Sequence, residues 1–364
     1  MKSCLIFPAC FSVLRPALIP GLLLMLLCPW FAQALPVEGL YRHELPVENQ
    51  SNSERQRAYT EALAAVVLKL TGESRWLEHE AVRRALGNAG NFVQEVSFRS
   101  AGQSYITVSF SASQIDAMLI DAGIPIWDRN RPSVLIWLTI QDANGQRSIL
   151  GSDSEHELID IIQDFSRQRG IPLLLPMLDL VDRRNLPVDL AWSLDENAIR
   201  EASARYGADS ILSGRLLITP AGELVGLWQF QFLAQIDRFD SLDRDMSSYM
   251  QMPLERITTQ LASHFGIIRS PGRMLETVNL QVQGVATLAA YAQMLDYLKG
   301  LAVVNEVSLK QLQGDEVELE LKLWADNVKL IEFLSLDRDL QAMPALNTDL
   351  RGRGTGGLRY RWTR

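Results

Sequence analysis

The stretch that decides the fold class is VLIWLTI, residues 134–140, in which every position except Thr139 is apolar. Such a continuous apolar run is typical of a strand covered on both faces, because a strand with one solvated face alternates apolar and polar residues. Helical patterns follow at 152–169 and 195–206, with a short apolar strand at 173–175 between them. This succession of strands and helices predicts a mixed α/β sheet with at least one parallel pair.

The remainder of this middle unit, residues 133–268, predicts a hairpin and a closing helix. The hairpin consists of strand 210–218 and strand 224–236, and the second strand is long enough to bend or bulge. Pro253 is expected to begin the closing helix, since proline is common in the first helical turn.

The preceding unit, residues 35–128, predicts a small α+β domain. A strand is expected over 37–47 and a long amphipathic helix follows it, ending at Gly72. A second helix is expected at about 77–86. A hairpin of strands 93–99 and 105–110 and a short helix then complete the unit.

Serine side chains are expected to begin three of these helices. Ser51 with Glu54, and Ser152 with Glu155, have the spacing of a capping box, in which each side chain accepts a hydrogen bond from a free backbone N–H. Ser113 is expected to cap the short helix before the unit boundary.

The last unit, residues 273–364, predicts a third small domain. Apolar residues alternate with charged ones over 317–323, so that strand has one buried and one solvated face. The expected elements are strand 278–282, helix 288–299, a strand around 307–309, strand 317–323, helix 326–341 and strand 358–362. This βαββαβ order is that of a ferredoxin-like sandwich. The fold class is therefore expected to be α+β or α/β, with three small domains.

Residues 1–34 have the pattern of a cleavable signal peptide. Lys2 and Arg15 are the only charges, an apolar run follows at 17–31, and Ala32-Gln33-Ala34 supplies a small-x-small cleavage site. The run is shorter than the ~20 residues of a spanning helix. We therefore expect export to the periplasm as a soluble protein, with a retained membrane anchor as the alternative.

Composition limits the chemistry of the mature chain. A net charge of −8 disfavours a nucleic-acid partner, and 47% hydrophobic residues exclude a disordered chain. Cys4, Cys10 and Cys28 all lie in the signal segment, so the mature chain has no disulfide, thiol nucleophile or Cys-ligated metal. The four histidines form no HExxH motif. We expect no catalytic residue, metal site or cofactor.

Asp179 and Asp182 form a candidate ligand pocket, because they follow the strand at 173–175 where α/β sheets often bind ligands. A carboxylate-dependent hydrolase is the catalytic alternative that they leave open. A loop salt bridge with the adjoining Arg183 and Arg184 is the structural alternative.

Two arginine-containing segments are candidate interaction surfaces. The boundary between the first two units contains Trp127, Asp128, Arg129 and Arg131, and Trp and Arg are enriched at interface hot spots. The alternative is that Trp127 packs between the domains.

The last 14 residues, 351–364, contain five arginines and no acidic residue, although the protein as a whole is acidic. These arginines would suit an anionic partner or a peripheral contact with lipid headgroups. The alternative is that they protect an edge strand from pairing with another chain. The arginines are Arg351, Arg353, Arg359, Arg361 and Arg364.

Several motifs resemble an exported bacterial envelope family known as domain of unknown function 2066. They are the helix Arg57–Gly72, the strand and helix Tyr105–Gly123, the segment Trp127–Leu138 and the segment Tyr206–Leu216. The resemblance covers about residues 35–268 and implies no catalytic residues. The middle unit is also similar to α/β domains of periplasmic accessory proteins, because a helix ending in Tyr-Gly-Ala-Asp leads into a strand.

These observations favour a non-enzymatic periplasmic module that binds or assembles with another cell-envelope protein. The alternatives are the carboxylate-dependent hydrolase and an envelope protein held at the membrane by a retained anchor or by the C-terminal arginines. The oligomeric state stays open.

Overall fold

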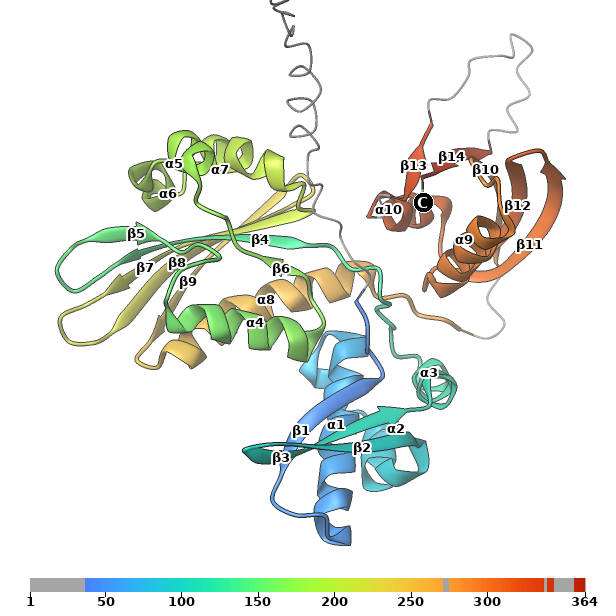
Figure 1. Ribbon diagram of the computed structural model, residues 1–364, viewed down its shortest axis with the longest axis horizontal. Helices are drawn as coiled ribbons and strands as arrows, with labels where there is room; N and C mark the ends of the chain where they lie inside the picture. The colour runs from blue at the N-terminus through green and yellow to red at the C-terminus, as the bar shows by residue number, and fades with distance from the viewer. Residues whose placement is uncertain (1–36, 271–274, 337–338, 344–356, 364) are drawn as a thin grey trace, which may run out of the picture. The chain divides into compact units, whose positions relative to one another are not determined.

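The computed structural model describes residues 37–270, 275–336, 339–343 and 357–363. The expected signal peptide, residues 1–34, lies outside this part of the chain. Within the described residues, no helix has the length and apolar character needed to cross a membrane. Residues 34–364 form one compact unit, which contains three β-sheets (Figure 1). The expected mixed fold with several small domains is therefore confirmed.

The first sheet has the order β1-β3-β2 and is antiparallel throughout. Its elements are β1 (Arg42–Val47), β2 (Val93–Ala101) and β3 (Gln103–Phe110), together with the helices α1 (Asn52–Thr71), α2 (Glu80–Gly87) and α3 (Ala112–Asp121). Helix α1 buries Leu63, Val66 and Leu70 against the sheet, as its helical spacing predicts. It ends at Gly72 in the left-handed conformation, which glycine adopts without a Cβ penalty.

Three local details of the first unit differ from expectation. Strand β1 begins at Arg42 rather than at residue 37. Ser51 does cap α1, but the Glu54 carboxylate accepts from the backbone N–H of Glu48 instead of from that of Ser51. Helix α3 begins after Ser111 rather than at Ser113, and Ser111 makes no side-chain capping bond. The residue types locate the starts of α1 and α3 to within a few residues. Which capping hydrogen bonds form there depends on the neighbouring segments of the chain.

The second sheet has the order β5-β4-β7-β8-β9, and β6 also pairs with β4. Its strands are β4 (Val134–Gln141), β5 (Arg147–Ile149), β6 (Leu173–Leu174), β7 (Ser210–Ile218), β8 (Leu224–Phe232) and β9 (Gln235–Asp243). Strand β4 is parallel to both β6 and β7, so the expected parallel pairing is confirmed.

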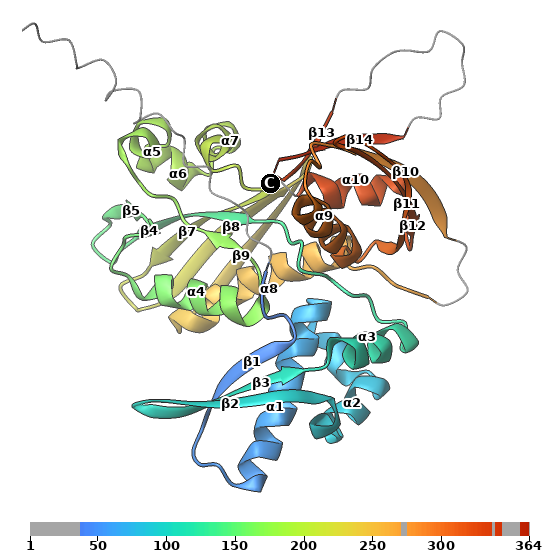
Figure 2. The ribbon, with the colours of Figure 1, turned by 45° about the vertical axis from the view of Figure 1, so that its right-hand side comes forward.

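Helices cover β4 on both faces, as its continuous apolar run predicts (Figures 1 and 2). Ile136 and Leu138 pack in one cluster with α4 (Glu157–Arg169) and α8 (Met246–Phe265). Leu135 and Trp137 pack in a second cluster with the short helices of the opposite layer. These helices are α5 (Leu180–Asn185), α6 (Val188–Ser193) and α7 (Glu196–Ser203).

The starts of two helices in this unit were wrongly predicted. Helix α4 begins at Glu157, capped by the His156 ring, whose Nδ1 accepts from the backbone N–H of Leu158; Ser152 does not cap it. Helix α8 begins at Met246 after an Asp245 cap, so Pro253 lies inside the helix instead of at its start.

The expected long strand over 224–236 is two strands, β8 and β9, joined by a tight turn. Leu233 takes a positive φ of 53° in that turn. The turn lacks the glycine or asparagine that usually signals a hairpin, so the sequence pattern gave no reason to divide the strand.

The third sheet has the order β11-β12-β10-β14-β13. Its elements in chain order are β10 (Glu276–Gln283), α9 (Leu288–Gly300), β11 (Val304–Gln313), β12 (Glu316–Leu323), α10 (Asn327–Ser335), β13 (Leu340–Ala342) and β14 (Leu358–Trp362). The strand–helix–strand–strand–helix order is found, but α10 ends at Ser335 and the added strand β13 follows it. Helix α10 forms the crossover between β12 and β13 and thereby sets the direction of β13. Strand β14 then runs antiparallel to β13 and parallel to β10.

Candidate functional site

The candidate site is built around the segment between α3 and β4, residues 124–133, which we call the connector. Its backbone pairs with distant parts of the chain. Ile126 forms an antiparallel bridge with Ile267, and the N–H of Trp127 donates to the carbonyl oxygen of Leu70 at 2.7 Å. The connector is thus hydrogen-bonded to the segment after α8 and to the end of α1.

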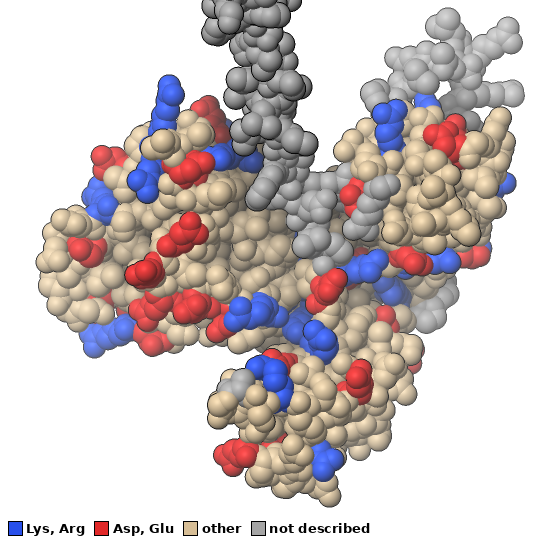
Figure 3. All heavy atoms as spheres, viewed as in Figure 1, with Lys and Arg blue, Asp and Glu red and all other residues tan. Residues whose placement is uncertain are grey.

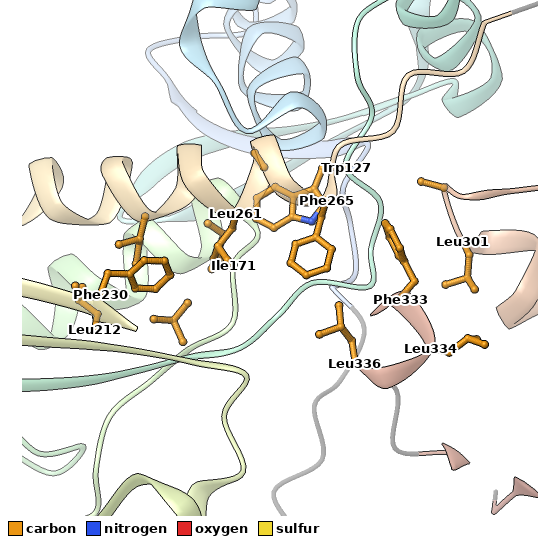
Figure 4. Close-up of a cluster of buried hydrophobic side chains, with 14 of the residues drawn as sticks. Trp127, Ile171, Leu212, Phe230, Leu261, Phe265, Leu301, Phe333, Leu334 and Leu336 are labelled. Carbon is orange, nitrogen blue, oxygen red and sulfur yellow. The ribbon is translucent and has the colours of Figure 1, made fainter. Parts of the chain in front are cut away.

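Trp127 is buried inside the protein, as in the alternative in which it packs between the domains instead of forming an exposed hot spot. Its side chain is fully buried against Leu261 and Phe265 of α8 (Figure 4). The Arg131 guanidinium lies 4.2 Å from the centre of the Trp127 ring, a cation–π contact. Phe265 in turn packs edge-on against Phe333 of α10, with ring centres 5.6 Å apart. Trp127 therefore packs within the chain rather than on a free surface.

Arg131 is the centre of the connector's hydrogen bonding. Its side chain is 4% exposed and donates only to backbone carbonyl oxygens. The acceptors are those of Trp127, Asp128, Lys69, Arg169 and Gly170, at 2.6 to 3.1 Å. Burial lowers the pKa of this guanidinium, although an arginine remains charged at neutral pH. Arg131 joins the connector to the ends of α1 and α4.

Asp128 joins the connector to the last unit. Its buried carboxylate accepts from the backbone N–H of Asn130 at 2.8 Å and from that of Ala302. Burial raises the pKa of this carboxyl, and the two backbone donors and Arg131 oppose that rise. The Asn130 amide donates to the carbonyl oxygen of Phe333 at 2.8 Å. Two side chains of the connector are therefore hydrogen-bonded to the last unit, one to the segment between α9 and β11 and one to α10.

Arg129 points away from this buried network and is exposed. It lines a cavity of about 700 Å³ that we call the junction cavity. Within it the Tyr41 hydroxyl donates to the Asp116 carboxylate at 2.7 Å, and burial raises the pKa of both groups. Other charged residues of the lining are Glu38, Asp128, Arg269, Asp296 and Lys299.

A neighbouring buried cation, Lys69, predicts a pH dependence. Its Nζ donates to the carbonyl oxygen of Arg42 at 2.8 Å, and burial together with Arg131 and Arg42 lowers its pKa to about 8. Since the unfolded chain then binds more protons between pH 8 and 10.5, Lys69 makes stability rise with pH across that window. We expect urea unfolding to show that Lys69→Met flattens this rise by about 2 kcal/mol.

Lys322→Met is the matched control for that measurement. Lys322 is paired with Glu306 on an open sheet face, and this pairing raises its pKa. Its contribution to stability is therefore lost only above pH 10.5. A wild-type-minus-Lys69→Met difference that stays constant from pH 7 to 10 would contradict the assignment.

The structure places Asp179 and Asp182 around one arginine, Arg205. Asp179 begins α5 by accepting from two backbone N–H groups, and it forms a two-pronged ion pair with Arg205 at 2.7 and 2.8 Å. That guanidinium holds the pKa of Asp179 well below its usual range. Asp182 is 1% exposed and accepts from Arg205, from the N–H of Leu178 and from the hydroxyl of Tyr206. An ion pair is present, but its cation is Arg205 and not the adjoining arginines.

The C-terminal arginines divide between described and undescribed residues. Arg351, Arg353 and Arg364 lie outside the described residues. Arg359 and Arg361 lie on β14, opposite Gln281 and Gln283 of β10. Because β14 is flanked by β10 and β13, the alternative that these arginines protect an edge strand is wrong.

The described residues contain no group of three or more His, Asp or Glu side chains placed to hold a metal ion. Figure 3 shows acidic and basic side chains interspersed over the viewed face rather than gathered into a field of one sign. The residues that sequence reasoning missed are Lys69, Arg169 and Asn130. Lys69 and Arg169 stand in the last turn of a helix, where a basic residue ordinarily reaches solvent, so no signal marked them.

Comparison with known proteins concerns mainly the first unit. Residues 34–128 match the family described as Domain of unknown function (DUF8605). No curated protein matches this chain. One similar solved structure, titled "Crystal structure of uncharacterized protein", shares 13% identity over 37% of this chain and 89% of that chain, with a TM-score of 0.15. A likeness at that level carries no argument.

The family match corrects the resemblance to domain of unknown function 2066. The matched family is a different one, and the match ends at Asp128 instead of continuing to residue 268. The motifs that suggested the resemblance are a capped helix, a strand and a short helix, which unrelated α+β domains share. Residues 34–128, which include the first part of the connector, are therefore similar to DUF8605.

Proposed function

We propose that this protein, after export to the periplasm, is a non-catalytic binding or assembly module for another protein of the cell envelope. The observation that carries the proposal is the junction cavity. Its walls come from residues 37–41, which precede β1, and from α3, the connector and α9. Clefts between packed domains are preferred places for binding sites, because several elements can each contribute a group.

The connector supports this proposal by holding the cavity walls in place. Arg131 ties the ends of α1 and α4 to the connector, and Asp128 ties it to Ala302. Both side chains are buried, so their hydrogen bonds are not competed for by water. A site with fixed walls loses less conformational entropy when a partner binds.

The cavity rim indicates what the partner presents. Arg129 and Lys299 are exposed there, and neither forms an ion pair among the described residues. Arg269 lies beside them and donates to the carbonyl oxygen of Ala302 at 3.1 Å. A segment of the partner that carries a carboxylate fits these cations.

Site-specific photocrosslinking in the periplasm tests the proposal. A benzoylphenylalanine at Lys299 is expected to give one adduct of discrete mass, and Arg129→Glu is expected to remove that adduct. The control position is Arg84, whose side chain is 73% exposed on α2. Failure to form an adduct at Lys299, or the same adducts from both positions, would overturn the proposal.

A further inference from the structure

Strand β9 is an edge strand of the second sheet, and it lacks the register irregularity, the proline or the short length that each of the other edge strands has. Among the described residues it pairs with β8 alone, in continuous register over its whole length. The other edge strands of the three sheets carry such features, which discourage pairing with another chain. Strands β2 and β11 have register irregularities, β1 contains Pro46, and β5 and β13 are short.

The turn before β9 determines which of its backbone groups are free. In a two-residue hairpin the flanking residues, here Phe232 and Gln235, form a hydrogen-bonded pair, and such pairs alternate with non-bonded ones. Residues 235, 237, 239, 241 and 243 therefore direct their N–H and C=O groups to β8. The intervening residues direct theirs to the open edge. These are Ile236, Arg238, Asp240 and Leu242.

The same four residues have their side chains on the sheet face opposite α8. The alternate residue Phe239 is buried on the α8 face, with the Arg256 guanidinium 4.5 Å from its ring centre. On the open face, Leu242 is 71% exposed and Ile236 is 39% exposed. Asp240 has no hydrogen bond or ion pair among the described residues. The edge thus presents an apolar, a basic, an acidic and an apolar side chain in order.

This order is complementary to itself when two strands run antiparallel. We propose that β9 pairs with β9 of a second copy of this chain about a two-fold axis at Phe239, which joins the two second sheets into one. Arg238 of each copy then lies opposite Asp240 of the other, and Ile236 lies opposite Leu242. Each of these is a hydrogen-bonded pair, so the free N–H and C=O groups of both edges are satisfied.

Charge selects this register over its neighbours. A shift by two residues in one direction places Arg238 opposite Arg238 of the other copy, and a shift in the other direction places Asp240 opposite Asp240. Like charges directly opposite destabilise strand pairing. The Arg238 guanidinium is also oriented in advance, by an ion pair with Glu196 and by a hydrogen bond to the side-chain oxygen of Gln229. Its side chain remains 60% exposed, so it can contact a second copy.

Charge reversal gives a sharp test by light scattering and sedimentation of the mature protein. We expect the wild type to dimerise with increasing concentration. Arg238→Asp places aspartates opposite each other, and Asp240→Arg places arginines opposite each other. Each variant alone is expected to dimerise at least ~10-fold more weakly. An equimolar mixture of the two is expected to regain the dimer, because every facing pair is again of opposite charge.

Arg84→Asp on α2 is the control for a general effect of charge and is expected to dimerise like the wild type. Thermal unfolding checks that all variants remain folded. A wild type that stays monomeric at every concentration would overturn the proposal. A dimer that survives both single variants, or a mixture that stays monomeric, would overturn it equally.

Discussion

Replacing Arg131 with methionine is expected to lower the free energy of unfolding by about 3–5 kcal/mol. Methionine fills a similar volume, but it donates no hydrogen bond to the backbone carbonyl groups that the guanidinium now satisfies. Those carbonyls lie where water has little access, so their desolvation is no longer compensated. Equilibrium urea unfolding, followed by circular dichroism, measures the loss.

Two further variants show whether the geometry of the guanidinium matters. Arg131→Lys keeps the charge, but its compact ammonium cannot reach carbonyls on several sides at once, so we expect it to recover less than half of the loss. Arg129→Met removes the neighbouring exposed arginine and is expected to change stability by less than ~0.5 kcal/mol. An Arg131→Met protein within ~1 kcal/mol of wild type would show that water replaces the guanidinium.

Gly72→Ala is expected to cost about 2–4 kcal/mol, for two separable reasons. Gly72 has a φ of 70°, which an alanine adopts at a cost of ~1 kcal/mol. A Cβ there would also lie 2.1 Å from the Cβ of Ala262 and 3.2 Å from the Trp127 ring. Because α8 and the connector are packed against each other, neither neighbour can move freely. The midpoint of urea unfolding reports the total cost.

Gly123→Ala separates the two contributions. Gly123 has a φ of 65°, but no atom lies within 4 Å of a Cβ built on it. We therefore expect a loss of only ~1 kcal/mol from backbone strain. Equal losses in the two variants would show that the contact with Ala262 and Trp127 relaxes without cost, which would contradict tight packing at the connector.

Patterns within a few residues account for the parts of the fold that were predicted correctly. The apolar run of β4 indicated a strand covered on both faces, and the alternation in β12 indicated one solvated face. Gly72 marked the end of α1, because glycine takes the left-handed conformation without a Cβ penalty. The division between β8 and β9 was missed, since a leucine holds the positive φ at that turn.

The candidate site depended on contacts between residues far apart in the sequence. The types of Trp127 and Arg131 are compatible with an exposed hot spot as well as with a buried contact. Trp127 and Arg131 are buried because the connector is hydrogen-bonded to the carbonyl groups of Leu70, Lys69 and Arg169. These carbonyl groups reach the connector only after α1 and α4 have packed. In the same way, Asp179 and Asp182 at the start of α5 form ion pairs with Arg205, which is more than 20 residues away in the sequence.

By itself, the sequence determined the mixed α+β class and the location of most strands, because hydrophobic periodicity is a local property that each segment carries with it. Tertiary structure alone decided which charged side chains are buried and what they bind. A guanidinium has the same N–H donors in every context. The fold determines whether carbonyl groups, a carboxylate or water accepts their hydrogen bonds.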